Sequence, residues 1–310
     1  MHNRQFDVVA LGEAMVEFNQ TRAGEPNYLQ GFGGDTSNAV IAASRAGART
    51  AYLSRLGGDS FGQSLLALWA DEQVDTTPVE VDADASTGLY FVKHGPTGHE
   101  FSYLRAGSAA SRMTPAWLRR GSVANAVRNA RVLHLSGISL AISASACDTA
   151  FAAMKLAKDA GTLVSFDSNL RLKLWPIDRA LACTTHAISL CDIFLPSLED
   201  VTALNGMTDP DEVVAWGHRL GAKTVVLKLG ADGALVSDGT TRERVAVHAV
   251  TLVDATGAGD CFCGNLLARV AAGDTIFDAA RYANAAAALT VQGYGAVAPL
   301  PRPAQVRALL

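Results

Sequence analysis

The chain has 310 residues, of which 49% are hydrophobic and 18% charged, and its formal net charge is −4. This composition is that of a globular protein and excludes disordered and fibrous classes. The chain has no long basic block of the kind that nucleic-acid binding favours, and no apolar run approaching the roughly 20 residues that span a bilayer. We therefore expect neither nucleic acid nor a membrane as a partner.

The cysteines and the N-terminus point to a cytoplasmic protein. The five cysteines show neither a CxxC pair nor the spacing of zinc ligands. A disulfide framework is not expected in a chain of this size. The first residues, "MHNRQFDVVALGE", lack the apolar segment and cleavage site of a secretory signal.

In the first half of the chain, strands alternate with helices, and two segments interrupt the alternation. The run "FDVVALGEAMVEFN" is typical of a buried parallel strand, "NAVIAASRAGA" of a helix, "TAYLSRLG" of a strand and "FGQSLLALWADEQ" of an amphipathic helix. The interruptions span residues 13–32 and 86–105. The second alternates with period two around a Gly/Pro turn, which predicts a β-hairpin. We expect both to form a small β-sheet lid over the main sheet; a hairpin without a role is the alternative.

The second half continues the alternation. Its strand-like runs include "ARVLHLSGISL", "TLVSFDSN", "CDIFLPS" and "KTVVLKLG". Strands separated by helices of 10–15 residues indicate βαβ units, a mostly parallel sheet and helices on both faces. We expect one α/β domain over residues 1–310. Residues 250–273, "VTLVDATGAGDCFCGNLLARVAAG", predict a strand, a turn and a helix.

The turn of this last unit joins glycines to an acid at the start of a helix. Gly257, Ala258 and Gly259 could direct backbone N–H groups at one anion, such as a phosphoryl group in transfer. Asp260 would then lie beside this anion hole, where a carboxylate can accept a proton from a hydroxyl. The alternative is a plain tight turn in which Asp260 caps the helix. The turn matches neither the P-loop pattern nor GxGxxG.

A second motif indicates the function of this turn. Residues 31–62, "GFGGDTSNAVIAASRAGARTAYLSRLGGDSFG", and "DATGAGD" about two hundred residues later resemble the two signatures of the ribokinase-like, or PfkB, carbohydrate kinase family. The resemblance extends over nearly the whole chain. It implies the ribokinase-like α/β fold with a β-sheet lid, and ATP-dependent phosphorylation of a sugar. "HLSGISLAI" and "FDSNLRLKLW" are most similar to members that phosphorylate the sugar acid 2-keto-3-deoxygluconate at its terminal C6 hydroxyl.

The resemblance also implies a role for each matching residue. Asp260 matches the catalytic base, and residues 257–259 match the anion hole. The positions matching acceptor-binding residues are Gly33, Gly34, Asp35, Asn38, Tyr90, Tyr103, Arg105 and Arg171. The positions matching nucleotide-binding residues are Asp167, Asn169, Lys228, Gly230, Gly233, Gly257, Gly259 and Asn284. ATP and Mg²⁺ are the implied cofactors, and a monovalent cation is left open.

Some of these residues also have a direct chemical rationale or an ordinary alternative. Arg105 and Arg171 suit a keto acid because a guanidinium binds carboxylate in bidentate fashion. Asn38 could instead be a helix N-cap, Lys228 could face solvent, and Asn284 could be an exposed helical residue. The "ADG" between Gly230 and the following strand could be a plain hairpin turn.

The chain departs from the family pattern at two places. Where the family often has an NxxE motif for Mg²⁺ and phosphate, this chain has "SLED", which leaves open whether Glu199 or Asp200 acts on the metal through water. Tyr294 stands where the related sugar-acid kinases tend to carry a charged residue near the acceptor.

Other functions remain open at this point. Within the family, a fructokinase, a ribokinase or a kinase for an isomeric sugar acid would use the same motifs. A sugar-binding regulator without catalysis is disfavoured because Asp260 and its glycines are present. A nicotinamide dehydrogenase lacks its GxGxxG fingerprint here. Since related kinases pack two lids together, we expect a homodimer, with a higher oligomer left open.

Overall fold

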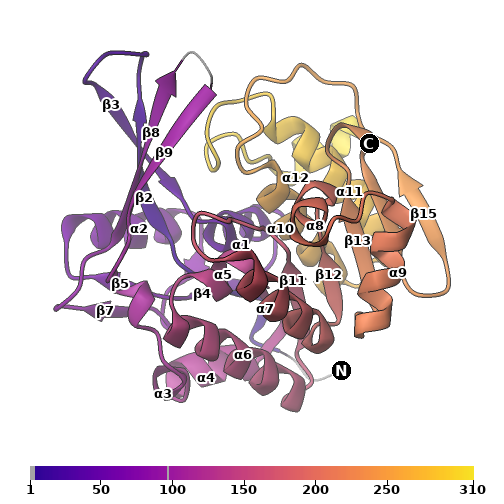
Figure 1. Cartoon of the computed structure of the whole chain (residues 1–310), viewed down its shortest axis with the longest axis horizontal. Helices are drawn as coiled ribbons and strands as arrows, with labels where there is room; N and C mark the ends of the chain where they lie inside the picture. The colour runs from indigo at the N-terminus through magenta and orange to yellow at the C-terminus, as the bar shows by residue number, and fades with distance from the viewer. Residues whose placement is uncertain (1–3, 96–97) are drawn as a thin grey trace.

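The computed structural model describes residues 4–95 and 98–310. Its centre is a sheet with the strand order β15-β14-β13-β12-β11-β10-β1-β4-β6 (Figure 1). The strands from β13 to β6 are parallel, and β14 and β15 add antiparallel at one edge. The strands are β1 (Phe6–Leu11), β4 (Thr50–Leu53), β6 (Val74–Asp75), β10 (Ala130–Ser136), β11 (Leu163–Asp167), β12 (Ile193–Leu195), β13 (Thr224–Lys228), β14 (Ala234–Ser237) and β15 (Arg242–Val245).

Helices cover both faces of this sheet, so its strands are apolar on both sides. In β1, Val8 packs with α1 (Asp35–Arg45), α10 (Ala258–Ala272) and α11 (Ile276–Thr290), whereas Val9 packs in the cluster on the other face. The helices of that other face are α3 (Pro115–Leu118), α4 (Gly121–Arg128), α5 (Gly137–Ala141), α6 (Ala144–Asp159), α7 (Ile177–Leu190), α8 (Leu198–Asn205) and α9 (Pro210–Leu220). A third cluster includes α2 (Ser60–Asp71) and α12 (Pro303–Leu309). The predicted α/β architecture is confirmed.

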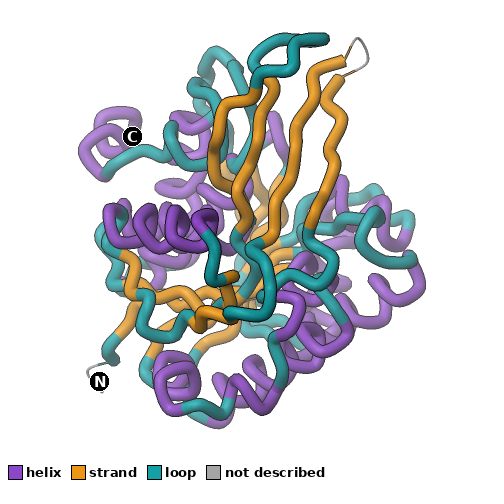
Figure 2. The backbone as a smooth tube through the Cα atoms, turned by 90° about the vertical axis from the view of Figure 1, so that its left-hand side faces the viewer, coloured by secondary structure: helices purple, strands orange, loops and turns teal. Residues whose placement is uncertain are grey.

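A second, smaller sheet stands off from this body (Figure 2). Its strand order is β3-β2-β8-β9. The strands are β2 (Met15–Gln20), β3 (Tyr28–Gly33), β8 (Gly88–Gly95) and β9 (Gly98–Leu104). The predicted hairpin is therefore present, although Pro96 and Thr97 of its turn lie outside the described residues. A short pair, β5 (Arg55–Gly57) and β7 (Glu80–Asp82), lies at the edge of the body.

The register of the small sheet arranges its side chains in rows. Glu17 pairs with Tyr90, and Tyr90 pairs with Tyr103, so these three side chains share one face. The same register places Leu29 and Phe101 in the next row of that face. Leu29 is 70% exposed and Phe101 is 40% exposed, whereas Asn19 and the buried Val92 lie between them in this row, so its two ends are apolar and exposed.

Three expectations about strands need correction. The run "TAYLSRLG" forms two strands, because β4 lies in the main sheet and β5 in the short pair. The run "FDVVALGEAMVEFN" is not one strand but two, because β1 lies in the main sheet and β2 in the small one. The predicted strand at 250–253 is absent, and these described residues form a loop. Leu252 is 66% exposed and Val253 41% exposed, and the Val253 N–H donates to the Val291 carbonyl at 2.8 Å rather than to a strand. No helix in the described part of the chain is long and apolar enough to cross a bilayer.

Candidate active site

The site forms at the carboxyl ends of the parallel strands, next to β1, where the strand order reverses. β1 lies between β10 and β4, and such a switch point leaves a crevice for ligands. β11 ends at Asp167 and β13 ends at Lys228, so both side chains reach this edge. The N-termini of α1 and α10 meet it from one face.

The first turn of α10 begins with a glycine in the left-handed conformation. Gly257 is the N-cap with φ 75°, and a Cβ there would lie 2.9 Å from the Cα of Ala296. No side chain of the described residues caps this helix, so the alternative that Asp260 is its cap is wrong. The N–H of Ala258 donates to the Ala255 carbonyl at 3.2 Å. That amide is used within the turn, which differs from the prediction that it faces an anion.

Asp260 contacts α1 directly. The Nδ2 of Asn38 donates to Oδ2 of Asp260 at 2.8 Å. Asn38 lies one turn inside α1, whose N-cap is Gly34, so the alternative of Asn38 as a helix cap is also wrong. Burial and the nearby carboxylate of Asp35 raise the pKa of Asp260 to about 7. A carboxylate with this pKa is well matched to general base catalysis near neutral pH.

Next to this pair are two polar oxygens that remain unpaired in the described structure. Asn169 has φ 26°, and its Nδ2 donates to Oδ2 of Asp35 at 2.7 Å. Oδ1 of Asp35 and Oδ1 of Asn38 are buried and accept no hydrogen bond from residues 4–95 or 98–310. Because buried polar atoms are usually paired, these two acceptors suit the hydroxyls of a ligand beside Asp260.

A buried ion pair lies on the other side of Asp260. Nζ of Lys228 donates to Oδ2 of Asp167 at 2.7 Å, and Sγ of Cys263 lies 3.3 Å from the same oxygen. The Lys228 side chain is only 14% exposed, so the alternative that it faces solvent is wrong. Burial alone would lower the pKa of Lys228, but Asp167 raises it above the usual value. The ammonium therefore stays charged.

The acids of "SLED" differ in position. Ser197 caps α8 by accepting from the Asp200 N–H at 3.1 Å. Oδ2 of Asp200 accepts from the Ser168 hydroxyl at 2.7 Å, close to Asp167, whereas Glu199 is exposed. Asp200 is therefore the acid that faces the site. Within residues 4–95 and 98–310, no three His, Cys, Asp or Glu side chains form a group that could hold a metal ion.

The small sheet contributes a second set of polar groups. The Tyr90 hydroxyl donates to Oε2 of Glu17 at 2.5 Å, and a Cβ on Gly33 would lie 2.2 Å from that hydroxyl. The Tyr103 ring lies 6.0 Å from the Tyr90 ring and is partly exposed. Arg105 does not lie free, because it forms an ion pair with Glu13.

The rest of the acceptor set is less central. Gly34 has φ 111°, and a Cβ there would lie 2.5 Å from the Glu13 carbonyl oxygen, so this position requires glycine. Arg171 is exposed, and its guanidinium donates to the carbonyl of Leu170 at 2.7 Å. Tyr294 is 80% exposed. The described structure therefore brings Asp35, Asn38 and Asp260 together but gives Arg171 no contact within this group.

Known proteins are similar to this chain over nearly its whole length. The family profile described as pfkB family carbohydrate kinase matches residues 5–303. The chain belongs to this family. A 2-dehydro-3-deoxygluconokinase of Thermoproteus tenax is 35% identical, with 98% of this chain and 94% of the relative covered. A probable fructokinase-7 of Arabidopsis thaliana is 32% identical, with 98% and 92% covered.

Solved structures show the same fold. The crystal structure of a putative ribokinase II from E. coli in complex with ATP and Mg²⁺ superposes with a TM-score of 0.88 at 26% identity, covering 97% of this chain and 98% of that one. The ribokinase-like fold and a PfkB carbohydrate kinase activity are thus shown for this chain, and the acceptor is what remains to be assigned.

Three of the residues of this PfkB kinase that match a nucleotide site, Gly230, Gly233 and Asn284, lie toward β14 and α11. Gly230 (φ 59°) and Gly233 (φ 84°) bracket a short 3-10 turn between β13 and β14, so the hairpin is present. A Cβ on Gly233 would lie 2.0 Å from the Val245 carbonyl oxygen. Asn284 is buried and donates to the Ala246 carbonyl at 2.5 Å, so it is not an exposed helical residue.

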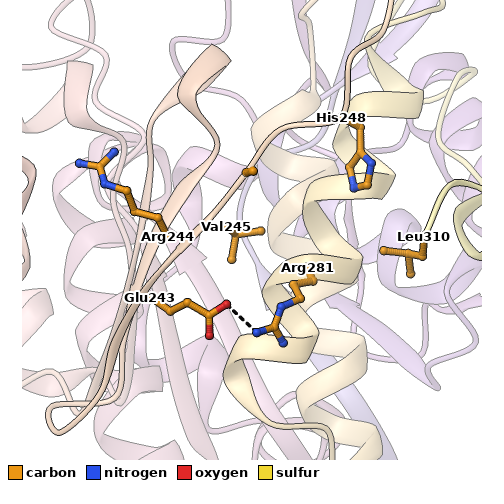
Figure 3. A pocket seen from close by; sticks show the side chains of 7 residues that line it. Glu243, Arg244, Val245, His248, Arg281 and Leu310 are labelled. Carbon is orange, nitrogen blue, oxygen red and sulfur yellow. Dashed lines mark hydrogen bonds and ion pairs between the residues drawn. The ribbon is translucent and has the colours of Figure 1, made fainter.

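A hollow of about 230 Å³ is lined partly by Ala246, whose carbonyl accepts the hydrogen bond from Asn284 (Figure 3). Its lining residues are Glu243, Arg244, Val245, Ala246, His248, Arg281 and Leu310. Arg281 is already paired with Glu243 and with Asp278. None of the residues predicted for the site lines this hollow, so it adds nothing to the chemistry at Asp260.

Four residues of the kinase site escaped prediction from the sequence. Glu13 and Glu17 are acids within the apolar run "LGEAMVEFN", and a buried acid in such a run was a usable signal. Ser168 and Cys263 gave no such signal. Cys263 is buried within α10, yet its thiol contacts both Asp167 and Lys228.

Proposed function

We propose that this PfkB kinase transfers the γ-phosphoryl group of ATP to the C6 hydroxyl of 2-keto-3-deoxygluconate, giving 2-keto-3-deoxy-6-phosphogluconate. The main support is Asp260, a carboxylate with a pKa raised to about 7 at the start of α10. It lies beside unpaired acceptors on Asp35 and Asn38 that suit sugar hydroxyls. The T. tenax 2-dehydro-3-deoxygluconokinase, 35% identical over nearly the whole chain, favours this acceptor.

In this proposal Asp260 removes the proton from the C6 hydroxyl as its oxygen attacks the γ-phosphorus. The hydroxyl oxygen gains the bond to phosphorus, and the bond between the γ-phosphorus and the bridging oxygen of ADP breaks. The N-terminus of α10 stabilises the negative charge on the phosphoryl oxygens. Tyr90, Tyr103 and Arg105 contact the acceptor from the small sheet, which acts as a lid and excludes water.

The carboxylates at the strand ends fit a metal that is bound mainly through phosphate and water. Asp200 lies beside Ser168 and Asp167, but the described residues offer no direct three-ligand cage. This donor set suits Mg²⁺, which keeps several waters and is held largely by nucleotide phosphates. When bound with ATP, Mg²⁺ neutralises phosphate charge, and Asp200 is the residue that would orient its waters.

Arg105 is the proposed contact for the acceptor's carboxylate. Its guanidinium is anchored on one side by Glu13, whose Oε1 accepts from the Ser108 hydroxyl at 2.5 Å. A guanidinium has five N–H donors, so Glu13 leaves several for a second carboxylate. Glu13 would thus orient Arg105 toward the acceptor.

The second candidate is a fructokinase. The probable fructokinase-7 of A. thaliana is almost as similar to this chain as the T. tenax enzyme. Glu13 and Glu17 also favour a neutral sugar, since two carboxylates in the acceptor pocket repel an anion.

A panel of acceptors separates these functions. With ATP and Mg²⁺, we expect kcat/KM for 2-keto-3-deoxygluconate to exceed that for fructose and ribose by at least about tenfold, the effect of one charged hydrogen bond. Arg105→Ala should raise KM for the sugar acid more than for fructose. A higher kcat/KM for fructose would contradict the sugar-acid assignment. An equal effect of Arg105→Ala on the KM of both acceptors would contradict it as well. ADP release that no acceptor stimulates would instead indicate a regulator.

Assembly and location belong to the same proposal. The exposed row of Leu29 and Phe101 on the lid suits contact with the same row of a second copy, giving a homodimer. We place this enzyme in the cytoplasm, where its five free cysteines would stay reduced.

A further inference from the structure

Two cysteines from neighbouring helices lie in contact. Cys147 lies in the first turn of α6 and Cys183 in the middle of α7, and the Cys147 thiol donates to Sγ of Cys183 at 3.9 Å. The two positions are 36 residues apart in the chain. The segment between them includes β11 and its last residue Asp167, so the contact depends on how the two helices pack.

A second contact holds α6 and α7 in this register. Phe151 follows Cys147 by one helical turn, and His186 follows Cys183 by nearly one turn. Their rings lie 4.8 Å apart. Residues three or four apart share a face of a helix, so the thiol pair and the ring pair lie along one seam. Because apolar side chains of both helices also pack in one core cluster, the two sulfur atoms are held facing each other.

The two thiols differ in their access to solvent. Cys183 is half-buried, whereas Cys147 is buried. Burial and the Cys183 thiol raise the pKa of Cys147 to about 12, and Arg179 at the start of α7 acts in the opposite direction. Oxidants react with the accessible and ionised thiol first. We therefore expect Cys183 to react first, with Cys147 as the second thiol within reach.

The other three cysteines differ from this pair. The sulfur atoms of Cys191, Cys261 and Cys263 lie against oxygen atoms of other groups. All three residues are buried. A thiol–thiol contact and access from solvent therefore occur together only at Cys147 and Cys183 among the five cysteines, all of which the structure describes.

We propose that Cys147 and Cys183 form a reversible oxidation site, at which a peroxide converts the two thiols into a disulfide that joins α6 to α7. Cys183 attacks one peroxide oxygen and becomes a sulfenic acid, and the rest of the peroxide leaves with the Cys183 proton as an alcohol or water. Sγ of Cys147 then attacks the Cys183 sulfur. The sulfur–oxygen bond breaks, and the hydroxyl leaves with the Cys147 proton as water. Two thiols are oxidised and one peroxide is reduced, and a dithiol reverses the bond.

The disulfide would close a loop of chain around β11. The sulfur atoms must approach from 3.9 Å to about 2 Å, which side-chain rotation and small helix shifts can supply. A cross-link between positions 36 residues apart removes conformations from the unfolded chain and so stabilises the fold. The closed loop carries Asp167 and Asn169 of the candidate site, so oxidation would stabilise the segment that positions them. Without peroxide, the reducing cytoplasm keeps both thiols free.

Counting thiols in the full-length protein tests this site. Wild type, Cys147→Ala, Cys183→Ala and the matched control Cys191→Ala are treated with hydrogen peroxide, unfolded and alkylated. In wild type we expect three alkylated cysteines instead of five, a cross-linked peptide containing Cys147 and Cys183, and five alkylated cysteines after a dithiol is added. Cys191→Ala should form the same disulfide. In Cys147→Ala, dimedone should trap the sulfenic acid on Cys183.

Melting temperatures measure the effect of the bond on stability. Oxidised wild type should melt roughly 5 °C or more above reduced wild type, because the closed loop lowers the entropy of the unfolded chain. Peroxide should give no such rise in Cys183→Ala. Each protein is compared with its own reduced form, so a variant that is itself less stable still gives a valid comparison.

Three results would overturn the inference. If peroxide leaves five alkylated cysteines in wild type, or oxidises Cys183 to a sulfinic acid without a disulfide, the two thiols are only packed together. A disulfide between any other two cysteines would show that the contact does not direct oxidation. An unchanged or lower Tm of the oxidised protein would refute the stabilising role of the bond. These measurements need no substrate, so they stand or fall separately from the proposed kinase function.

Discussion

Asp260 lies near a helix N-terminus, which favours its charged form, but other neighbours favour its neutral form. Burial and the carboxylates of Asp35 and Asp167 raise its pKa, while the Asn38 amide and Lys228 act in the other direction. The net result is a pKa of about 7, so the base is half protonated at neutral pH. Two measurable consequences follow for this one residue, one for the rate and one for stability.

The rate should depend on pH through Asp260. If Asp260 is the base, as proposed, it works only when ionised, so kcat/KM should rise with pH and level off above its pKa of about 7. At pH 6 the rate should be about a tenth of the plateau value, as expected for a base one unit below its pKa. Initial rates from pH 5 to 9 at subsaturating acceptor test this. A flat profile, or a midpoint near 4, would show that the environment of Asp260 has been misjudged.

Stability should respond to pH in the opposite direction. The pKa of Asp260 is raised in the folded state, so folded protein binds more protons than unfolded chains between about pH 4 and 7, and stability from this residue is lost as pH rises through that window. Asp260→Asn removes the effect and still accepts the bond from Asn38. It should lower kcat about 10²–10⁴-fold. It should raise Tm at pH 8 by a few degrees relative to wild type, roughly 2–4 °C per kcal/mol.

The control for this variant is its melting temperature at pH 4, where both proteins carry a neutral side chain at position 260. There the two values should agree. A variant that is less stable than wild type at pH 8 would mean that Asp260 contributes a favourable charge interaction, contrary to the raised pKa.

Among the elements, the crossing of α1 and α10 decides whether the site is assembled. Gly264 lies on the α10 face toward α1, and a Cβ there would lie 2.1 Å from the Ala39 carbonyl oxygen. The helices can approach this closely only because Gly264 has no side chain. Asn38, one residue before Ala39, reaches Asp260 across the same crossing.

We therefore expect Gly264→Ala to push the two helices apart. The clash involves backbone that cannot move aside, so the free energy of unfolding should fall by about 1–3 kcal/mol. kcat should fall as well, because Asn38 moves relative to Asp260. Gly121→Ala in α4 is the matched control, since a Cβ there meets nothing within 4 Å among the described residues. Denaturant unfolding and initial rates of both variants test this prediction. If Gly264→Ala and Gly121→Ala changed the free energy of unfolding and kcat equally, the close crossing of α1 and α10 would be disproved.

The elements also show what the sequence could and could not predict. The alternation of strands and helices was enough to predict a parallel sheet. Helices cover both faces of each strand, so the sequence of each strand is almost entirely apolar. The prediction of a strand at 250–253 was wrong, because an apolar run alone does not show whether another strand lies beside it to pair with. Val253 instead bonds to Val291 at the end of α11, and Leu252 remains exposed. Such a partner is fixed by tertiary structure, which local pattern does not contain.

At the site, motifs predicted only part of the set of residues that gather, and not how they are paired. The position of Asp260 followed from its helix start and the family resemblance. The contacts of Arg105 with Glu13 and of Lys228 with Cys263 join segments far apart in sequence, so spacing gave no indication of them. They change how the two cations are interpreted, since Arg105 is anchored by Glu13 and Lys228 contacts Asp167 and Cys263.

For the molecule as a whole, the exposed face of the lid predicts the state of assembly. We expect a homodimer in solution, because the apolar side chains of Leu29 and Phe101, at the two ends of one row of the lid, are exposed. The pair Leu29→Glu and Phe101→Glu should give monomers, since like charges would then face each other across the two-fold axis. Sedimentation at micromolar concentration measures this.

Val81→Glu is the control for assembly. Val81 is 53% exposed on β7, outside the lid, so the same chemical change there should leave the dimer intact. If wild type sediments as a monomer, or if Val81→Glu dissociates the dimer equally well, the lid is not the interface.

The hydrogen bond between Asn38 and Asp260 joins positions 222 residues apart in the chain. Ribosomes therefore complete α1 long before they reach α10. A nascent chain that does not yet contain α10 lacks Asp260, the proposed base. A fragment that ends before α10 should thus be inert rather than an unregulated ATPase.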